Sequence, residues 1–228
     1  MRIDILTIFP DVFNYFDFSI IKRAREKKVV EINIWNLRDF TKDKHKKVDD
    51  KVYGGGKGMV LKCQPIFDGV EYIKKKNKKA KVVLTTPQGT LYNQELAKKL
   101  SKEKGLIIIC GHYEGVDERV ENICDYEISI GDYILTGGEI PAMVIVDSVV
   151  RLLPGVLPEE APEFDSFHQY IFDWPCYTRP ENFRGMKVPE VLLSGNHKKI
   201  EKWRKEKAIE KTKEKRPDIY EKYIRGRK

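Results

Sequence analysis

The chain contains the stretch Ile130-Gly131-Asp132-Tyr133-Ile134-Leu135-Thr136-Gly137-Gly138-Glu139, which is its most informative sequence. An apolar run ends in Gly-Asp, and a second apolar pair then meets Gly-Gly. Glycine permits conformations and close approaches that a β-carbon forbids, so the pattern predicts sharply bent backbone with amide groups available to a ligand. The alternative is a tight connection that is buried for packing alone.

The length of 228 residues suits one large domain, or one domain and a smaller one. The composition is 41% hydrophobic and 34% charged. The sequence contains no run of 18 apolar residues, so we expect no membrane-spanning helix. The N-terminus shows no signal-peptide pattern. The four cysteines form no C-x-x-C pair. We therefore expect a reduced, cytoplasmic protein without a structural zinc or other metal site.

The net charge of +8 is placed unevenly along the chain. Residues 187–228 hold 15 Lys and Arg against 7 Asp and Glu, whereas residues 1–186 are balanced. A basic segment attached to a neutral body favours a polyanionic partner such as nucleic acid. A solvated, Lys-rich helix face is the alternative.

Strands and helices are expected to alternate along the first two thirds of the chain. The predicted strands are short and β-branched: Arg2–Phe9, Val30–Leu37, Ala80–Thr85, Leu106–Cys110 and Tyr126–Ile130. The predicted helices are Val12–Glu26, Pro65–Lys75, Asn93–Lys102, Gly115–Ile123 and Ile140–Leu153. This alternation predicts an α/β domain with a mostly parallel sheet.

A Pro-rich, acidic stretch at 154–165 is the candidate linker. After it come an aromatic, loop-rich stretch at Phe167–Arg184 and two predicted helices, near His197–Glu214 and Pro217–Tyr223. The C-terminal part is thus expected to be small, basic and helical.

Three glycine-containing segments follow predicted strands. They are Thr86-Pro87-Gln88-Gly89, Gly111-His112-Tyr113-Glu114-Gly115 and the segment 130–138. Ligands bind at the carboxyl ends of parallel strands, so the three segments can converge on one pocket. Their glycine and aromatic content suits a flat heterocycle held by main-chain groups.

Two further features remain open from residue type alone. Lys51–Met59 contains three glycines before Lys57 but fails the Walker pattern, so it is either a basic loop that touches a phosphate or a surface hairpin. Asp165 lies 14 residues after Arg151 and has the residue type of a helix cap. The four histidines are dispersed and predict neither a metal cluster nor a catalytic triad.

The chain resembles the bacterial tRNA (guanine-N1)-methyltransferases, the TrmD family of the SPOUT superfamily. The resemblance runs nearly from end to end. It is carried by Asp4–Pro10, His45–Asp50, Tyr53–Gly56, Gly111–Arg119, Ile130–Glu139, Arg151–Leu157, Tyr177–Glu181 and Val191–His197. The sequence departs from the family pattern at Lys57 and His112.

The resemblance implies a SPOUT fold with a deep trefoil knot at residues 1–157, a flexible linker at 158–168 and a basic, all-α tRNA-binding domain at 169–228. It implies a homodimer whose active sites are shared between subunits, and methylation of N1 of guanine 37 in tRNA. The methyl donor would be S-adenosylmethionine. The donor-binding residues would be Thr86, Pro87, Gln88, Gly89, Gly111, Tyr113, Glu114, Gly115, Ile130, Gly131, Asp132, Tyr133, Ile134, Leu135, Gly137 and Gly138.

The resemblance also assigns Asp165 as general base and Arg151 as its partner near the guanine. Residues His45, Asp49, Asp50 and Arg179 would bind the substrate. An aspartate is a weak base for the N1 proton, so the anion that develops on O6 needs a donor such as the Arg151 guanidinium. The family is described as magnesium-dependent, and Mg²⁺ could serve the same role. No carboxylate cluster in the sequence specifies its site.

Two other functions are compatible with parts of the sequence. A ribose 2′-hydroxyl methyltransferase would keep the fold and change the acceptor, and the match over the whole chain argues against it. A non-catalytic RNA-binding protein would use only the basic tail, and it would not bind S-adenosylmethionine.

Overall fold

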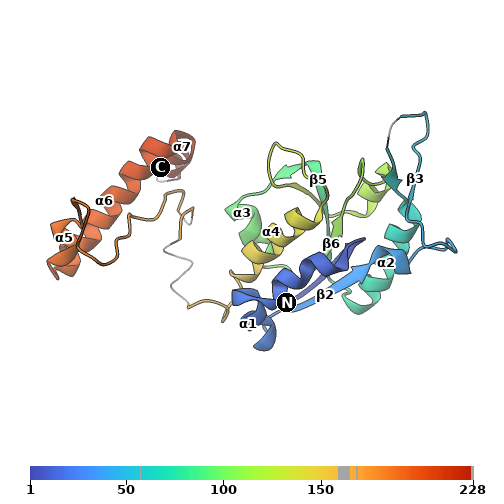
Figure 1. Ribbon diagram of the computed structural model, residues 1–228, viewed down its shortest axis with the longest axis horizontal. Helices are drawn as coiled ribbons and strands as arrows, with labels where there is room; N and C mark the ends of the chain where they lie inside the picture. The colour runs from blue at the N-terminus through green and yellow to red at the C-terminus, as the bar shows by residue number, and fades with distance from the viewer. Residues whose placement is uncertain (57, 159–164, 168, 227–228) are drawn as a thin grey trace. The chain divides into compact units, whose positions relative to one another are not determined.

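The computed structural model describes residues 1–56, 58–158, 165–167 and 169–226. The chain divides into two compact units, Met1–Leu157 and Pro158–Lys228 (Figure 1). Most of the expected linker at 158–168 lies outside the described residues. None of the described helices is both long and apolar enough to cross a membrane.

Unit 1 is built on a five-stranded sheet with the order β2-β1-β6-β5-β7, in which every neighbouring pair is parallel. The strands are β1 Arg2–Thr7, β2 Glu31–Asn36, β5 Lys81–Leu91, β6 Gly105–Cys110 and β7 Tyr126–Ser129. All five predicted strands are present, and the predicted α/β fold with a parallel sheet is confirmed. A short antiparallel pair, β3 Asp49–Asp50 and β4 Val60–Leu61, stands apart from this sheet.

The helices of unit 1 follow the predicted alternation with two differences. They are η1 Pro10–Asp17, α1 Ser19–Glu26, η2 Leu37–Asp39, α2 Cys63–Lys76, α3 Gln94–Leu100, η3 Glu118–Ile123 and α4 Glu139–Val150. The predicted helix Val12–Glu26 is divided, because Phe18 is extended between η1 and α1. The buried Phe13 and Phe16 of η1 are three residues apart, which suits the three-residue turn of a 3-10 helix. The predicted helix Gly115–Ile123 is likewise the shorter 3-10 helix η3.

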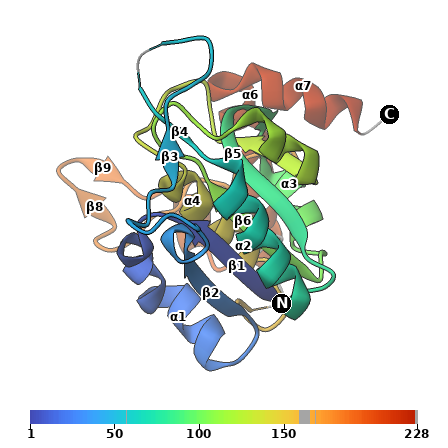
Figure 2. The ribbon, with the colours of Figure 1, turned by 90° about the vertical axis from the view of Figure 1, so that its right-hand side faces the viewer.

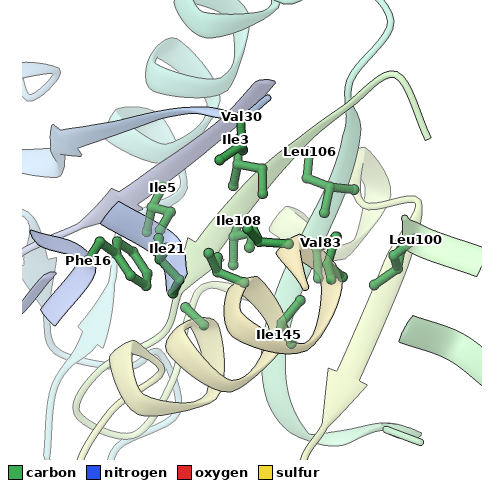
Figure 3. Packing of buried hydrophobic residues seen from close by; sticks show 14 of the residues in the cluster. Ile3, Ile5, Phe16, Ile21, Val30, Val83, Leu100, Leu106, Ile108 and Ile145 are labelled. Carbon is green, nitrogen blue, oxygen red and sulfur yellow. The ribbon is translucent and has the colours of Figure 1, made fainter. Parts of the chain in front are cut away.

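The sheet is covered on both faces, because side chains alternate along each strand. Leu106 and Ile108 of β6 join a core with η1, α1 and α4, whereas Ile107 and Ile109 join a second core with α2. Figure 3 shows the first core between the sheet and helix α4. Its labelled members are Ile3, Ile5, Phe16, Ile21, Val30, Val83, Leu100, Leu106, Ile108 and Ile145. Burial on two faces holds the strand ends, and so the segments that follow them, in fixed positions.

Asp4 in β1 is a fully buried charge. The Arg2 guanidinium donates two hydrogen bonds of 2.9 Å to its carboxylate. Trp35 Nε1 and Asn77 Nδ2 each donate another, also at 2.9 Å. Four donors on one carboxylate satisfy a group that would otherwise be costly to bury.

Unit 2 is mostly helical, as predicted. It contains α5 Glu190–Leu193, α6 His197–Lys215 and α7 Pro217–Arg225, and also a short hairpin, β8 Asn182–Phe183 with β9 Met186–Lys187, which the sequence did not predict. Buried Thr212 of α6 accepts a hydrogen bond of 2.8 Å from Phe172 N, so the segment before the hairpin is fastened to α6. Arg204 stacks over Trp174 at 4.7 Å from the ring centroid.

The Asp4 network predicts a large stability effect. Asp4→Ala should lower the free energy of unfolding by about 1–3 kcal/mol, because it leaves buried Asn77 Nδ2 and half-buried Trp35 Nε1 without their acceptor. Urea denaturation followed by circular dichroism measures it. Asp17→Ala is the matched control, since Asp17 pairs with Arg25 on the surface and its loss should be small. Equal losses in the two variants would contradict the prediction.

Candidate active site

A cleft of about 250 Å³ lies at the carboxyl ends of β6 and β7 and beside residues 84–87 in the middle of β5. It is lined by the three segments that the sequence placed there. The predicted residues that line it are Thr86, Pro87, Gly111, Tyr113, Glu114, Gly115, Ile130, Gly131, Tyr133, Ile134, Leu135, Gly137 and Gly138. The topology thus brings together three segments from separate parts of the chain, as expected for the edge of a parallel sheet.

Gln88, Gly89 and Asp132 do not line this cleft. The expectation that the strand ends at Thr85 is wrong, because β5 continues to Leu91 with a register shift between Thr85 and Thr90. A β-carbon on Gly89 would lie 2.4 Å from the backbone of Glu127 and Ile128, so Gly89 serves the close approach of β5 to β7. The segment 86–89 is therefore a bulged part of a strand rather than a loop.

The cleft is held together mainly by backbone contacts. Gly138 N donates a hydrogen bond of 2.7 Å to Gly111 O, and His112 forms an isolated antiparallel bridge with Gly137. Buried Thr85 donates from Oγ1 to Ile109 O at 3.1 Å. The two glycine segments after β6 and β7 are therefore tied to each other.

Only glycine fits at position 138 in this backbone geometry. A β-carbon there would lie 2.1 Å from Thr85 Oγ1 and 2.7 Å from Gly111 N. At Gly111 the nearest atom to a β-carbon would be 3.5 Å away, which is ordinary contact. Gly138 is thus required by its close approach to Thr85 and to the backbone of 110–111, which is a packing role, and the predicted exposure of amide groups to a ligand stays a prediction.

Several residues of the cleft were not predicted as site residues. They include Thr85, His112, Thr136 and Pro141. His112 lies within a predicted segment, but its dispersion from the other histidines gave no reason to single it out. Thr85 was assigned to a strand, and only the observed contact with Gly138 reveals that it supports the cleft.

The β3–β4 hairpin is attached to the cleft by main-chain hydrogen bonds. Glu114 N donates to Met59 O at 3.1 Å, and Leu61 N donates to Gly115 O at 3.0 Å. Figures 1 and 2 show the chain between β3 and β4 projecting from the body of unit 1. Tyr53 on this segment is fully exposed. The structure therefore agrees with the hairpin alternative for 51–59, and Lys57 lies outside the described residues.

The predicted substrate residues of unit 1 lie on or before this hairpin. His45 N donates to Asp43 Oδ1 at 2.8 Å, and Asp49 pairs with Leu61 in the hairpin. Asp50 pairs with Lys62 at 3.5 Å. Donation from the Lys51 backbone N–H and the Lys62 charge lower the pKa of Asp50, so this carboxylate is anionic at neutral pH.

The two predicted catalytic residues belong to different units. Arg151 is half-buried and directly follows α4, where its N–H donates to Asp147 O at 3.2 Å. Asp165 is half-buried in unit 2, and the adjacent Ser166 donates to Asp173 Oδ1 at 2.7 Å. The predicted substrate residue Arg179 is exposed in unit 2. Within the described ranges, no group of three or more His, Cys, Asp or Glu could hold a metal ion.

The chain matches the family model described as tRNA (Guanine-1)-methyltransferase TrmD over residues 1–222. A tRNA (guanine-N(1)-)-methyltransferase of Dictyoglomus turgidum is 58% identical over 225 residues, which are 97% of this chain and 91% of the relative. One of Clostridium tetani is 54% identical over 223 residues, with coverages of 97% and 93%. The crystal structure of tRNA (m1G37) methyltransferase from Aquifex aeolicus superposes with a TM-score of 0.80 at 48% identity. It covers 95% of this chain and 93% of that one.

The contact at Gly138 predicts a specific defect. Gly138→Ala should lower the free energy of unfolding by about 1–3 kcal/mol, because the added carbon overlaps a side chain and a backbone. Gly111→Ala is the matched control and should lose less, since its β-carbon has room. Urea unfolding measures both. The prediction is wrong if Gly138→Ala is as stable as Gly111→Ala.

Proposed function

The chain belongs to the tRNA (guanine-1)-methyltransferase family TrmD, and on that basis we propose which donor, acceptor position and residues it uses. It is a tRNA (guanine-N1)-methyltransferase. The proposed donor is S-adenosylmethionine, bound in the cleft between 111–115 and 130–138. The proposed acceptor is N1 of guanine 37, the position printed in the name of the Aquifex aeolicus enzyme. Because the substrate is tRNA, we expect the protein to act in the cytoplasm.

The observation that carries this proposal is the cleft itself. Its walls combine main-chain groups of glycine segments with apolar side chains such as Ile134 and Leu135, a surface suited to an adenosine moiety. Glu114 adds a carboxylate that favours a cationic ligand. The sulfonium supplies an electrophilic methyl group that needs little activation. The protein must therefore align the acceptor and deal with its proton.

N1 of a neutral guanine carries a proton and is a poor nucleophile. We assign Asp165 as the base that accepts this proton, and Arg151 as the donor to O6 as negative charge develops there. An arginine remains cationic at any physiological pH, so it can stabilise the guanine anion that a weak base alone could not produce. Positioning of N1 in line with the methyl group supplies a further large share of the rate.

Mg²⁺ is a further expectation of the family. It would assist at O6 in the same way as a guanidinium. No described cluster of acidic or histidine side chains singles out its site, so we assign it no residue.

We assign tRNA binding to unit 2 and to residues on and before the β3–β4 hairpin. Helix α6 carries much of the basic segment 187–228, which fits a phosphate backbone. The proposed contacts in unit 1 are His45, Asp49 and Asp50, and Arg179 adds one in unit 2. Under this assignment, residues 1–157 form the catalytic domain with its knot, 158–168 the linker and 169–228 the RNA-binding domain.

The proposed homodimer is supported by an exposed apolar face on unit 1. Val12, Tyr15 and Phe18 of η1 and its C-terminal end are 45–66% exposed. On α4, Ile140 is 51% and Val144 is 40% exposed. Tyr15 OH donates to Asp147 Oδ2 at 3.2 Å, so η1 and α4 form one surface. Contiguous apolar surface of this kind marks an interface. Because α4 begins directly after Gly138, a second subunit on this face would lie beside the cleft.

The assignment of the base gives the central test. Asp165→Ala should lower kcat for guanine methylation by about 10²–10⁴-fold, with donor affinity unchanged. Asp218→Asn, a charge change on α7, is the control and should keep near-normal turnover. Mass mapping of tRNA after reaction with labelled donor identifies the methylated atom. Normal turnover of Asp165→Ala would overturn the base assignment, and a ribose product would overturn the acceptor.

The apolar face gives a test of assembly. Val144→Asp places a charge in the proposed interface and should shift the protein from dimer to monomer in analytical ultracentrifugation. Methylation should fall with it, since each active site would draw on both subunits. Glu95→Asp, an exposed change on α3, should leave the dimer intact. A wild-type protein that sediments as a monomer at micromolar concentration would exclude the homodimer.

A further inference from the structure

His112 occupies the junction between the two segments that line most of the cleft. It lies two residues after the end of β6, and its backbone forms the bridge to Gly137 of the other segment. Its side chain is 19% exposed and lies on the cleft. Its Nδ1 atom is buried and has no hydrogen-bond partner within the described part of the chain. An unpaired buried ring nitrogen is unfavourable unless some state of the protein satisfies it.

A carboxylate that faces this nitrogen belongs to Glu139, the first residue of α4. Glu139 is 7% exposed, and its Oε1 accepts a hydrogen bond of 2.8 Å from Thr7 Oγ1. Its other oxygen, Oε2, lies 3.8 Å from His112 Nδ1. Hydrogen bonds between nitrogen and oxygen form at about 2.7–3.2 Å. A relative movement of about 1 Å would therefore complete the bond.

The backbone is shaped around this contact. A β-carbon on Gly137 would lie 2.4 Å from Glu139 Oε2 and 2.5 Å from His112 Nδ1. Glycine at this position thus leaves open the space in which the two side chains meet. The Glu139 carboxylate also affects the neighbouring Cys110. Burial is the main cause that raises the pKa of the Cys110 thiol, and the negative charge of Glu139 raises it further. A carboxylate in such a place gains from a second donor.

We propose that His112 is a positioning residue for methyl transfer. When the cleft is occupied, its Nδ1 donates a hydrogen bond to Glu139 Oε2. This bond, called the latch below, joins segment 111–115 to segment 130–138 and to α4. The latch rests on the proposed use of this cleft for S-adenosylmethionine. A ligand that touches both segments draws them together across the 3.8 Å gap, and the bond then holds them around it. Neither side chain needs to touch the reacting atoms.

A set of substitutions separates the hydrogen bond from ring packing. The His112 ring also contacts the rings of Phe9 and Tyr113, at 5.0 and 4.9 Å between centroids. His112→Asn keeps an N–H group near the Nδ1 position but loses the ring, whereas His112→Gln places its N–H group near the Nε2 position. Rescue by asparagine and not by glutamine is therefore specific to the latch.

The experiment uses the full chain and measures the Kd of S-adenosylmethionine by calorimetry, together with KM for the donor and for tRNA. His112→Ala and His112→Gln should raise the donor Kd and KM about tenfold, equivalent to about 1.4 kcal/mol, with the tRNA KM unchanged. His112→Asn should stay close to wild type. Glu139→Gln should weaken donor binding in the wild-type background and have no added effect in His112→Ala.

Thermal unfolding without donor checks that each variant is folded. If His112→Ala does not fold, the comparison of His112→Asn with His112→Gln still tests the latch. The latch is overturned if His112→Gln binds the donor like wild type, or if Asn and Gln weaken it equally. If wild-type protein binds no S-adenosylmethionine, the proposed function fails instead. If the wild-type protein binds S-adenosylmethionine and the His112 variants bind it equally well, the latch is excluded and the proposed function stands.

Discussion

The hydrogen bond from Gly138 N to Gly111 O is the contact on which the cleft depends. It joins two segments that are far apart in sequence. It depends on glycine at position 138, because a β-carbon there would lie 2.1 Å from Thr85 Oγ1 and 2.7 Å from Gly111 N. The central residues of β5, together with β6 and Ile128 of β7, are buried beneath these segments, so the strands cannot move apart there without opening the core. Rigid strands and bare backbone together give a pocket whose shape is largely set before any ligand arrives.

Strand β1 connects this pocket to the rest of unit 1 through two buried polar residues. Asp4 gathers donors from Arg2, Trp35 and Asn77, which fixes β1 against β2 and α2. Thr7, near the other end of the strand, donates to Glu139 at the start of α4. The strand therefore anchors the sheet at one end and the cleft at the other. Buried polar groups in such positions specify a single arrangement because any other would leave them unsatisfied.

Much of this architecture could be read from the sequence, because it follows local patterns. The five strands are apolar runs with β-branched residues, and the Gly-Gly pair marks the close backbone contact. What could not be read depends on distant partners. The extension of β5 past Thr85 requires the edge of β7, and the position of Gly89 makes sense only against that backbone. His112 was not singled out, because Glu139, whose Oε2 lies 3.8 Å from its Nδ1, is 27 positions away in the sequence. The knot and the roles of Asp165 and Arg151 come from resemblance alone and stay predictions.

The proposed division of catalytic residues between two units has a physical rationale. An aspartate is a weak base for an N1 proton, so the proposed mechanism relies on Arg151 to stabilise the anion and on accurate placement of the guanine. Arg151 directly follows α4, whose first residue adjoins the donor segments, whereas Asp165 belongs to the unit that carries the basic segment 187–228. Binding of tRNA to that segment would then determine where the base is held. Proton removal would be coupled to recognition of the correct RNA, while the proposed donor cleft, whose lining residues belong to unit 1, could fill independently.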